Sequence, residues 1–425
     1  MTLGLALSGG GSRAAAFHRG TLQALIDLGL RKDVTSVSTV SGGSLFGGAW
    51  LAALARNETD SQFLEAMSAE LQRGFVLRAI LHPRLLKLFV PFWKNRTDVL
   101  AELFDALFFR GASLSSLPAA PALCINVTIL DDAQVGKFHK GGFSSRVVAS
   151  SNAAYPLSRA VAASAAFPVG LPPLWLSRQR DLGGADFAKP FETRRGLSLT
   201  DGGVLENLGV QSLLQGRFES WDLVVSDAGT KEQPWKAHPL LGPIKSAFIA
   251  LLSGGALDKV LLLMNDKQNR WMRKHTMQLL LESWSRHTLS GTPPQLGAGM
   301  REWLGRDPVQ PRRRLLFVRV NQTFESMLES LVTWRLAELW DRQHPGVPLP
   351  SLPKTATELE RFLTDECGVA LTRARELYER LGGHAAADAM NEVSTQFTGL
   401  ARQTVDRLSL HAQWQVHAAH ALYWS

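Results

Sequence analysis

Three short stretches of this 425-residue chain combine residue types and spacings that suit attack by a nucleophile. In residues 37–44, Val-Ser-Thr-Val-Ser-Gly-Gly-Ser, apolar and β-branched residues run into Ser41, and two glycines follow it before a helical pattern begins. A serine at such a strand-to-helix turn is typical of a nucleophile elbow, in which the hydroxyl is exposed and the next backbone N–H groups face an oxyanion. A small polar residue there also serves as an ordinary helix N-cap, so this pattern alone leaves both interpretations open.

The second stretch is a glycine loop, Gly9-Gly10-Gly11-Ser12-Arg13, between a short apolar strand and a helical pattern. Glycines let backbone N–H groups approach a ligand with no Cβ in the way, and a helix start favours negative charge. The loop lacks the G-K-[ST] ending of a P-loop and the G-x-G-x-x-G dinucleotide pattern. It predicts a cradle for an oxyanion or a phosphate; a plain turn is the alternative.

The third stretch, residues 199–209, contains Asp201 at the end of a predicted strand, followed by two glycines. Asp-Gly-Gly is most often a plain turn. Here a helical pattern follows instead of a hairpin partner, and this favours a position for Asp201 at the same edge of the sheet as Ser41.

A nucleophilic serine needs a base, and none of the eleven histidines is well placed for a Ser-His-Asp triad. His18 lies on the first predicted helix, where a surface or core role suits it. An α/β-hydrolase has its nucleophile after several strands, whereas Ser41 follows the second predicted strand. We therefore predict a Ser41–Asp201 dyad in which the carboxylate takes the serine proton directly.

The elements that must position these residues follow from hydrophobic periodicity. A strand at Leu3–Leu7, a helix at 14–28, a strand at 36–40 and a helix at 45–55 predict an α/β sheet covered on both faces, with the site at the carboxyl ends of its strands. Further strands are predicted at 122–130, 134–139, 197–200, 222–226 and 314–320, and helices at 157–166, 256–288 and 398–424, with 62–110 mostly helical.

Composition limits the class of protein and its partners. A net charge of +8 indicates an anionic partner, and Cys124 and Cys367 are too far apart in the chain to form a metal motif or a disulfide framework. The N-terminus lacks the features of a signal peptide, and no run of about 20 apolar residues is present. We expect a cytoplasmic protein that has no transmembrane helix.

One strongly basic stretch lies between Glu70 and Asp98, with six Lys or Arg residues, no acidic residue, and interleaved aromatic and aliphatic side chains. This mixture suits an anionic membrane surface. A helical hairpin packed on the core, with a solvated basic face, is an equally good interpretation. The candidate membrane contacts are Arg73, Arg78, Arg84, Lys87 and Trp93.

Taken in order, GGGSRAAAFHRGTLQAL, VSGGS and TDGGVLENLGV resemble the patatin-like phospholipase family. ASAAFP at 163–168 and DLVVSDAGT at 222–230 also match stretches of such proteins, so the resemblance covers roughly residues 3–230. Cytosolic phospholipases of the same architecture are similar too. The resemblance implies a three-layer α/β patatin-like fold with a mostly parallel central sheet and a helical C-terminal part.

The same resemblance implies a catalytic region at 1–232, with a basic helical insertion at about 62–110, and a mostly helical region at 233–425 that completes or covers it. It implies a phospholipase A-type lipid acyl hydrolase that cleaves glycerophospholipid esters through an acyl-serine intermediate. Phospholipid or another fatty-acyl ester would be the substrate and an anionic membrane surface a peripheral contact. No nucleic acid, metal or organic cofactor is implied.

When the family's functional residues are matched to positions of this sequence, the resemblance implies that Ser41 is the nucleophile and Asp201 the base. The oxyanion donors would be Gly9, Gly10 and Gly11, while Arg13 and Gly43 would support the loop or contact a lipid phosphate. The sequence departs from the family at Thr39, where a glycine is common, and its Cβ crowds the elbow. A general lipase or thioesterase, an inactive lipid-binding protein and an anion-binding module remain as alternatives.

Overall fold

The computed structural model describes residues 2–74, 95–168, 171–214, 222–229, 315–331, 333–393 and 399–424. The helix predicted at 256–288 lies outside these residues. The described strands form one ten-stranded sheet, and its parallel part has the order β10 (Leu315–Arg319), β9 (Asp222–Asp227), β1 (Leu3–Leu7), β2 (Val34–Thr39) and β3 (Ala122–Ile129). β1 and β9 are buried along their whole length, as strands covered on both faces must be.

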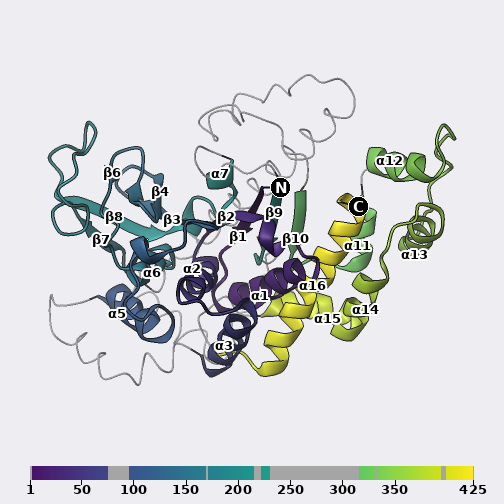
Figure 1. Cartoon of the computed structure of the whole chain (residues 1–425), viewed down its shortest axis with the longest axis horizontal. Helices are drawn as coiled ribbons and strands as arrows, with labels where there is room; N and C mark the ends of the chain where they lie inside the picture. The colour runs from purple at the N-terminus through teal and green to yellow at the C-terminus, as the bar shows by residue number, and fades with distance from the viewer. Residues whose placement is uncertain are drawn as a thin grey trace, which may run out of the picture.

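Beyond β3 the sheet continues as an antiparallel wing, drawn in teal on the left of Figure 1. Its strands are β4 (Gln134–His139), β5 (Gly142–Ser144), β6 (Ala149–Ser150), β7 (Leu174–Ser177) and β8 (Gly196–Asp201). The sequence predicted the β3–β4 hairpin and the position of β8, but neither the pairing of β8 with β3 nor that of β7 with β8.

Among the described residues, two separate hydrophobic cores lie on the two faces of the sheet. Because successive strand residues point to opposite faces, Leu5 and Leu7 of β1 join the larger core, whereas Ala6 between them joins the smaller one. The smaller core is closed by α7 (Val210–Leu213). Helices on both faces of a largely parallel centre confirm the predicted three-layer α/β fold.

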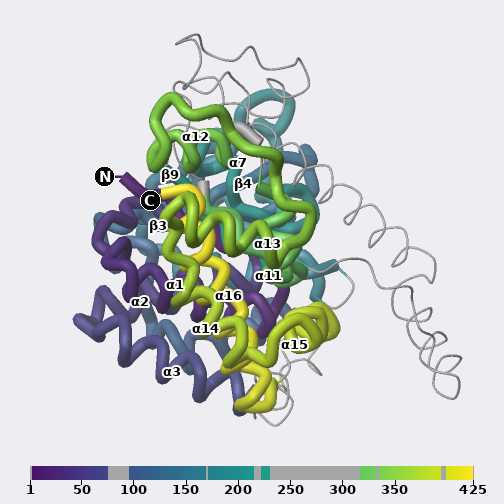
Figure 2. Tube along the Cα trace, turned by 90° about the vertical axis from the view of Figure 1, so that its right-hand side faces the viewer, coloured from purple at the N-terminus to yellow at the C-terminus, as the bar shows by residue number. Residues whose placement is uncertain are grey.

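The larger core is covered by α1 (Gly11–Asp27), α2 (Gly42–Ala55) and α16 (Arg402–Tyr423), with α3 (Asp60–Arg73) beside them. α1 and α16 lie side by side in Figures 1 and 2. Their backbones nearly touch at Gly20, where a Cβ would lie 2.0 Å from the carbonyl oxygen of Ser409. The N-terminal loop and the C-terminal helix are therefore parts of one packed unit.

Beyond β10, the described C-terminal residues are mostly helical, as predicted, and Figure 2 shows their course in green and yellow. Before α16 it comprises α11 (Phe324–Glu329), α12 (Thr333–Gln343), α13 (Ala356–Arg361), α14 (Thr372–Leu381) and α15 (Gly383–Ala389). α5 (Arg96–Phe104) and α6 (Leu157–Ser164) flank the antiparallel wing.

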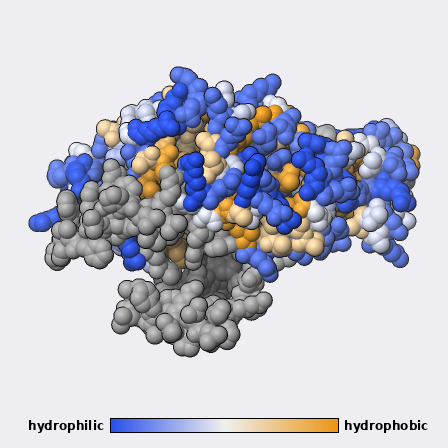
Figure 3. Space-filling view, turned by 90° about the horizontal axis from the view of Figure 1, so that it is seen from below, coloured by the Kyte–Doolittle hydropathy of each residue, from blue (hydrophilic) through white to orange (hydrophobic). Residues whose placement is uncertain are grey.

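The surface seen from below in Figure 3 is mostly hydrophilic, and hydrophobic residues form small separate areas on its coloured part. The large apolar side chains that are exposed in the described part of the chain are Leu130, Trp175 and Val347. None of the helices described is both long enough and apolar enough to cross a membrane.

Candidate active site

Ser41 lies in the sharp turn between β2 and α2, with φ 51° and ψ −118°. This left-handed region is rarely occupied by residues other than glycine and persists only where the surrounding structure holds it. Ser41 occupies the N-cap position of α2, yet its side chain makes no capping hydrogen bond. The hydroxyl is therefore not used as an ordinary helix cap.

The Ser41 hydroxyl instead donates a hydrogen bond to the carboxylate of Asp201. A second hydrogen bond reaches this carboxylate from the Gly203 N–H, at 2.7 Å from Oδ1. Asp201 is 3% exposed, and its burial raises the pKa to about 7, although both hydrogen bonds act in the opposite direction. A carboxylate with a pKa near 7 is a much stronger proton acceptor than an ordinary aspartate.

Ser41 and Asp201 meet because the carboxyl ends of β2 and β8 face each other along the same edge of β3. β2 runs parallel to β3 until Thr39 lies opposite Ile125, and β8 runs antiparallel to β3 until Asp201 lies opposite Val127. β4 occupies the other edge of β3 over these positions, so β2 and β8 share one edge and run toward each other. Their carboxyl ends therefore converge at the middle of β3.

The glycine loop adds backbone N–H groups beside this pair. Gly10 has φ 139° and Gly11 has φ 58°, which are conformations that favour glycine. Within the part of the chain that the structure describes, the N–H groups of Gly10, Gly11 and Gly42 have no hydrogen-bond acceptor. Gly42 packs directly on the loop, because a Cβ there would lie 2.6 Å from the Gly11 nitrogen. These three N–H groups are candidate donors to an oxyanion.

Gly9 was also expected to supply an oxyanion donor, but its N–H group makes a different hydrogen bond. It donates to the carbonyl oxygen of Asn207 at 3.1 Å. The absence of a side chain at Gly9 is still required, since a Cβ would lie 2.3 Å from Asn207 Oδ1 and 3.1 Å from Ser41 Cβ. Gly9 thus leaves room for these neighbours, and Gly42 takes its place among the candidate donors.

Arg13 and Gly43 make contacts that support the loop. Arg13 is 3% exposed, and its guanidinium donates to the carbonyl oxygens of Ala228 and Val393 at 2.9 and 2.8 Å. A Cβ on Gly43 would lie 2.2 Å from the Leu7 carbonyl oxygen, so glycine lets α2 approach the end of β1.

His18 lies beneath the glycine loop and is fully buried. Its Nε2 lies 2.8 Å from the Ser8 carbonyl oxygen and its Nδ1 lies 2.8 Å from Ser226 Oγ. A carbonyl can only accept, so Nε2–H donates to Ser8 and Nδ1 accepts from the Ser226 hydroxyl. Burial lowers the His18 pKa to about 4, so the neutral ring supports the loop and is directed away from the Ser41 hydroxyl.

Two residues of the Asp201 motif were given no role by the sequence. Glu206 is buried and accepts from the Leu208 and Gly209 N–H groups, each at 2.8 Å, and burial raises its pKa to about 7. Asn207 Oδ1 lies between the glycine loop and the Asp201 turn, since a Cβ would approach it to 2.3 Å from Gly9 and to 2.6 Å from Gly203. Only the spacing within 199–209 pointed to either residue.

Most of the basic stretch lies outside the described residues, including Arg78, Arg84, Lys87 and Trp93. Arg73, at the end of α3, has a 65% exposed side chain and forms an ion pair with Glu70 at 3.0 Å.

Comparison with known proteins identifies the family of the N-terminal half of the chain. Residues 5–214 match the sequence profile of patatin-like phospholipases. The chain carries a patatin-like phospholipase domain. Ser41 and Asp201 lie within the matched residues of this domain. The elements β9, β10 and α16 lie beyond its end. No curated protein matches the chain by sequence.

Solved structures show more distant similarity. Human GIVD cytosolic phospholipase A2 is 13% identical with a TM-score of 0.49, and the match covers 99% of this chain and 60% of that one. VipD from Legionella pneumophila is 13% identical with a TM-score of 0.29, covering 86% of this chain and 66% of that one. This chain therefore spans about three fifths of the length of the human phospholipase.

Proposed function

We propose that this chain is a phospholipase A-type lipid acyl hydrolase that uses Ser41 as nucleophile and Asp201 as base. The observation that supports this most is the hydrogen bond from the strained Ser41 hydroxyl to a buried carboxylate whose pKa is about 7. A serine held only for structural reasons needs neither the strained turn nor a base. The patatin-like domain makes a lipid ester the expected substrate class.

The first half of the reaction forms an acyl-serine. Ser41 Oγ attacks the ester carbonyl carbon while its proton passes to Asp201. The carbonyl oxygen becomes an oxyanion and accepts hydrogen bonds from the N–H groups of Gly10, Gly11 and Gly42. When the carbon–oxygen bond to the alcohol breaks, Asp201 returns the proton to the departing oxygen, and a lysophospholipid leaves.

The second half repeats these steps with water. Asp201 takes a proton from the water molecule as its oxygen attacks the acyl carbon, and the same N–H groups stabilise the second oxyanion. The bond to Ser41 Oγ then breaks, the proton returns to Oγ, and the free fatty acid leaves. One carboxylate thus serves both steps, with no imidazole.

A fluorophosphonate probe tests this proposal, because it reacts covalently only with an activated serine. We expect the wild-type chain to be labelled, Ser41→Ala not to be labelled, and Asp201→Asn to be labelled very slowly. Losses of ester hydrolysis in the two variants should be far from additive, since the residues act as one unit. An unlabelled wild-type chain would favour an inactive lipid-binding or anion-binding protein.

Substrate comparison separates a phospholipase from a general lipase or thioesterase. We expect hydrolysis rates to depend on the head group of the glycerophospholipid and to exceed those on triacylglycerols and acyl thioesters. Equal rates on all three substrates would support the general enzyme instead.

A further inference from the structure

The stretch Ala-Ser-Ala-Ala-Phe-Pro at 163–168 has no part in the chemistry above, yet it contacts both proposed catalytic residues. Ser164 is the last residue of α6 and is fully buried, and its Oγ accepts the backbone N–H of Ser41 at 3.0 Å. Two residues later, the Ala166 carbonyl oxygen accepts the backbone N–H of Asp201 at 3.1 Å. One short segment thus holds the backbone of the nucleophile and of the base.

We propose that residues 164–166 form a brace that fixes Ser41 relative to Asp201, with Ser164 as a positioning residue for the reaction. The inference rests on the proposed function, because it assigns a role in aligning that dyad. Ser164 lies 123 residues from Ser41 along the chain, so nothing in the local pattern of the elbow points to it.

The hydrogen bonds of Ser164 leave its hydroxyl little freedom. It donates to the Asn126 carbonyl oxygen at 2.6 Å, which turns its lone pairs toward the Ser41 N–H. Ser44 Oγ lies 2.8 Å away on the other side. A hydroxyl with three fixed neighbours can hold the N–H of a strained turn in one direction.

Asn126 links the brace to the strands that carry the dyad. It lies on β3 between the positions opposite Thr39 and Asp201, where β2 and β8 end. Its side-chain Nδ2 donates to the Thr39 carbonyl oxygen and to Ser38 Oγ, each at 2.9 Å. The Thr200 hydroxyl donates to Ala166 at 2.7 Å and completes the link to β8.

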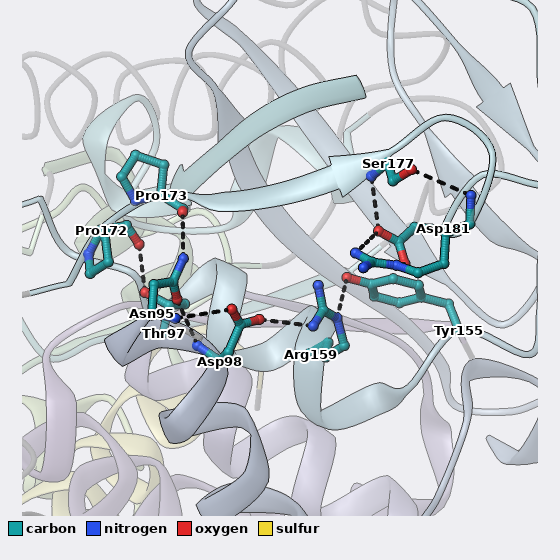
Figure 4. Close-up of polar contacts among 10 residues, drawn as sticks. Asn95, Thr97, Asp98, Tyr155, Arg159, Pro172, Pro173, Ser177 and Asp181 are labelled. Carbon is teal, nitrogen blue, oxygen red and sulfur yellow. Dashed lines mark hydrogen bonds and ion pairs between the residues drawn. The ribbon is translucent and has the colours of Figure 1, made fainter. Parts of the chain in front are cut away.

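A polar network at the other end of α6 restrains the helix that carries Ser164, and Figure 4 shows its members. Arg159 of α6 forms an ion pair with Asp98 of α5 at 2.8 Å, and its Nε donates to the Tyr155 hydroxyl at 3.4 Å. Asn95 caps α5 at the Asp98 N–H. α6 is therefore anchored to its neighbours at one end and to the dyad at the other.

The test compares Ser164→Ala with Ser158→Ala, a matched change at a buried serine on the same helix. For a soluble short-chain ester, we expect Ser164→Ala to lower kcat and the rate of fluorophosphonate labelling by roughly 10- to 100-fold while KM stays within about twofold. Ser158→Ala should be close to the wild type, and Ser164→Thr, which keeps the hydroxyl, should recover most of the rate. A purely structural role predicts no such difference in kcat between folded variants.

Two further variants keep the result interpretable if Ser164→Ala folds poorly. Ser164→Cys nearly conserves volume but has a weaker acceptor, so it should show an intermediate kcat even where the alanine variant folds poorly. Thr200→Val removes one link to Ala166 with little change in shape and should lower kcat less than Ser164→Ala. Wild-type labelling rates in folded Ser164→Ala and Ser164→Cys would overturn the brace alone, whereas an unlabelled wild-type chain would overturn the proposed function.

Discussion

The hydrogen bond between Ser41 and Asp201 joins a nucleophile directly to a carboxylate that is buried and costly to ionise. Because the Asp201 pKa is about 7, its titration falls in the range in which a histidine base would also titrate. The shape of a pH profile therefore cannot identify the base by itself, and variants must accompany it.

We expect kcat/KM for a soluble ester to fall on acidification with a midpoint near pH 7, because Asp201 must be ionised to accept the proton. Glu206→Gln removes the neighbouring carboxyl, whose pKa is also about 7, and should leave this midpoint in place. The pKa of His18 is about 4, so His18→Ala should keep the midpoint near 7 while it weakens the support of the loop. A histidine variant that folds but no longer shows the fall in kcat/KM near pH 7 would contradict the dyad.

The raised pKa of Asp201 also predicts that this residue lowers the stability of the folded protein at neutral and alkaline pH. Unfolded Asp201 ionises near pH 3.9 and the folded residue near pH 7, so the folded state loses stability as the pH rises between these values. Asp201→Asn avoids this loss, and we expect it to be more stable than the wild type by about 4 kcal/mol at pH 8 and equal to it near pH 4. Denaturant unfolding at both pH values measures this.

The exposed Asp406 provides the control for that measurement. Its side chain is 51% exposed, so Asp406→Asn should show no comparable gain between pH 4 and pH 8. A wild-type chain whose stability matches that of Asp201→Asn at pH 8 would show that Asp201 ionises at an ordinary pKa.

At the scale of elements, both helix starts beside the site are built from glycine. α1 begins at Gly11 and α2 at Gly42, each three residues before the start that hydrophobic periodicity predicted. Glycines carry no apolar signal, so the pattern begins late. Their N–H groups are nevertheless the part of each helix that faces the candidate oxyanion site.

We expect Gly10→Ala to lower kcat by about 10²- to 10³-fold, as loss of an oxyanion donor does in other enzymes, because a side chain at φ 139° must distort the loop. Gly29→Ala is a matched control, since Gly29 has φ 70° and open space around it. The control should lose about 1 kcal/mol of stability and keep its kcat. Equal kcat values for both variants would place the oxyanion donors in another loop.

At the scale of the whole molecule, the sheet is completed by residues beyond the patatin-like match. β9 pairs with β1 and β10 with β9, while α16 packs on α1 beneath the glycine loop. The guanidinium of Arg13 reaches the Val393 carbonyl and ties the loop to this C-terminal part. The boundary at 232 remains a prediction, because 230–314 lie outside the described residues.

A second prediction at this scale concerns the expected contact of the basic stretch with an anionic membrane surface. We expect reversal of Arg78, Arg84 and Lys87 to glutamate to weaken sedimentation with anionic vesicles, at roughly 1 kcal/mol per residue near the surface and less in high salt. Hydrolysis of a soluble ester should be unchanged. Reversal of Arg373, which is 52% exposed on α14, should leave vesicle binding unaltered. Unchanged sedimentation of the triple variant would favour the packed helical hairpin.

The sequence by itself predicted the central strands and the residue types at their ends, but not the short strands β5, β6 and β7. Runs of apolar, β-branched and small residues marked β1, β2, β3 and β9 to within two residues, because strands buried on both faces carry few charged side chains. Glycines after a serine or an aspartate marked the turns. These are signals of local backbone conformation, and local signals can be read from neighbouring residues.

Only the tertiary structure decided how these parts meet. The convergence of Ser41 and Asp201 depends on β8 running antiparallel to β3 beyond the end of β2, and a strand's own sequence does not specify its partner. The pairing of Gly9 with Asn207 and of Ser164 with Ser41 joins residues more than a hundred positions apart. Such contacts exist only once the sheet and its two cores have formed, because packing brings the polar groups together and burial then requires each to find a partner.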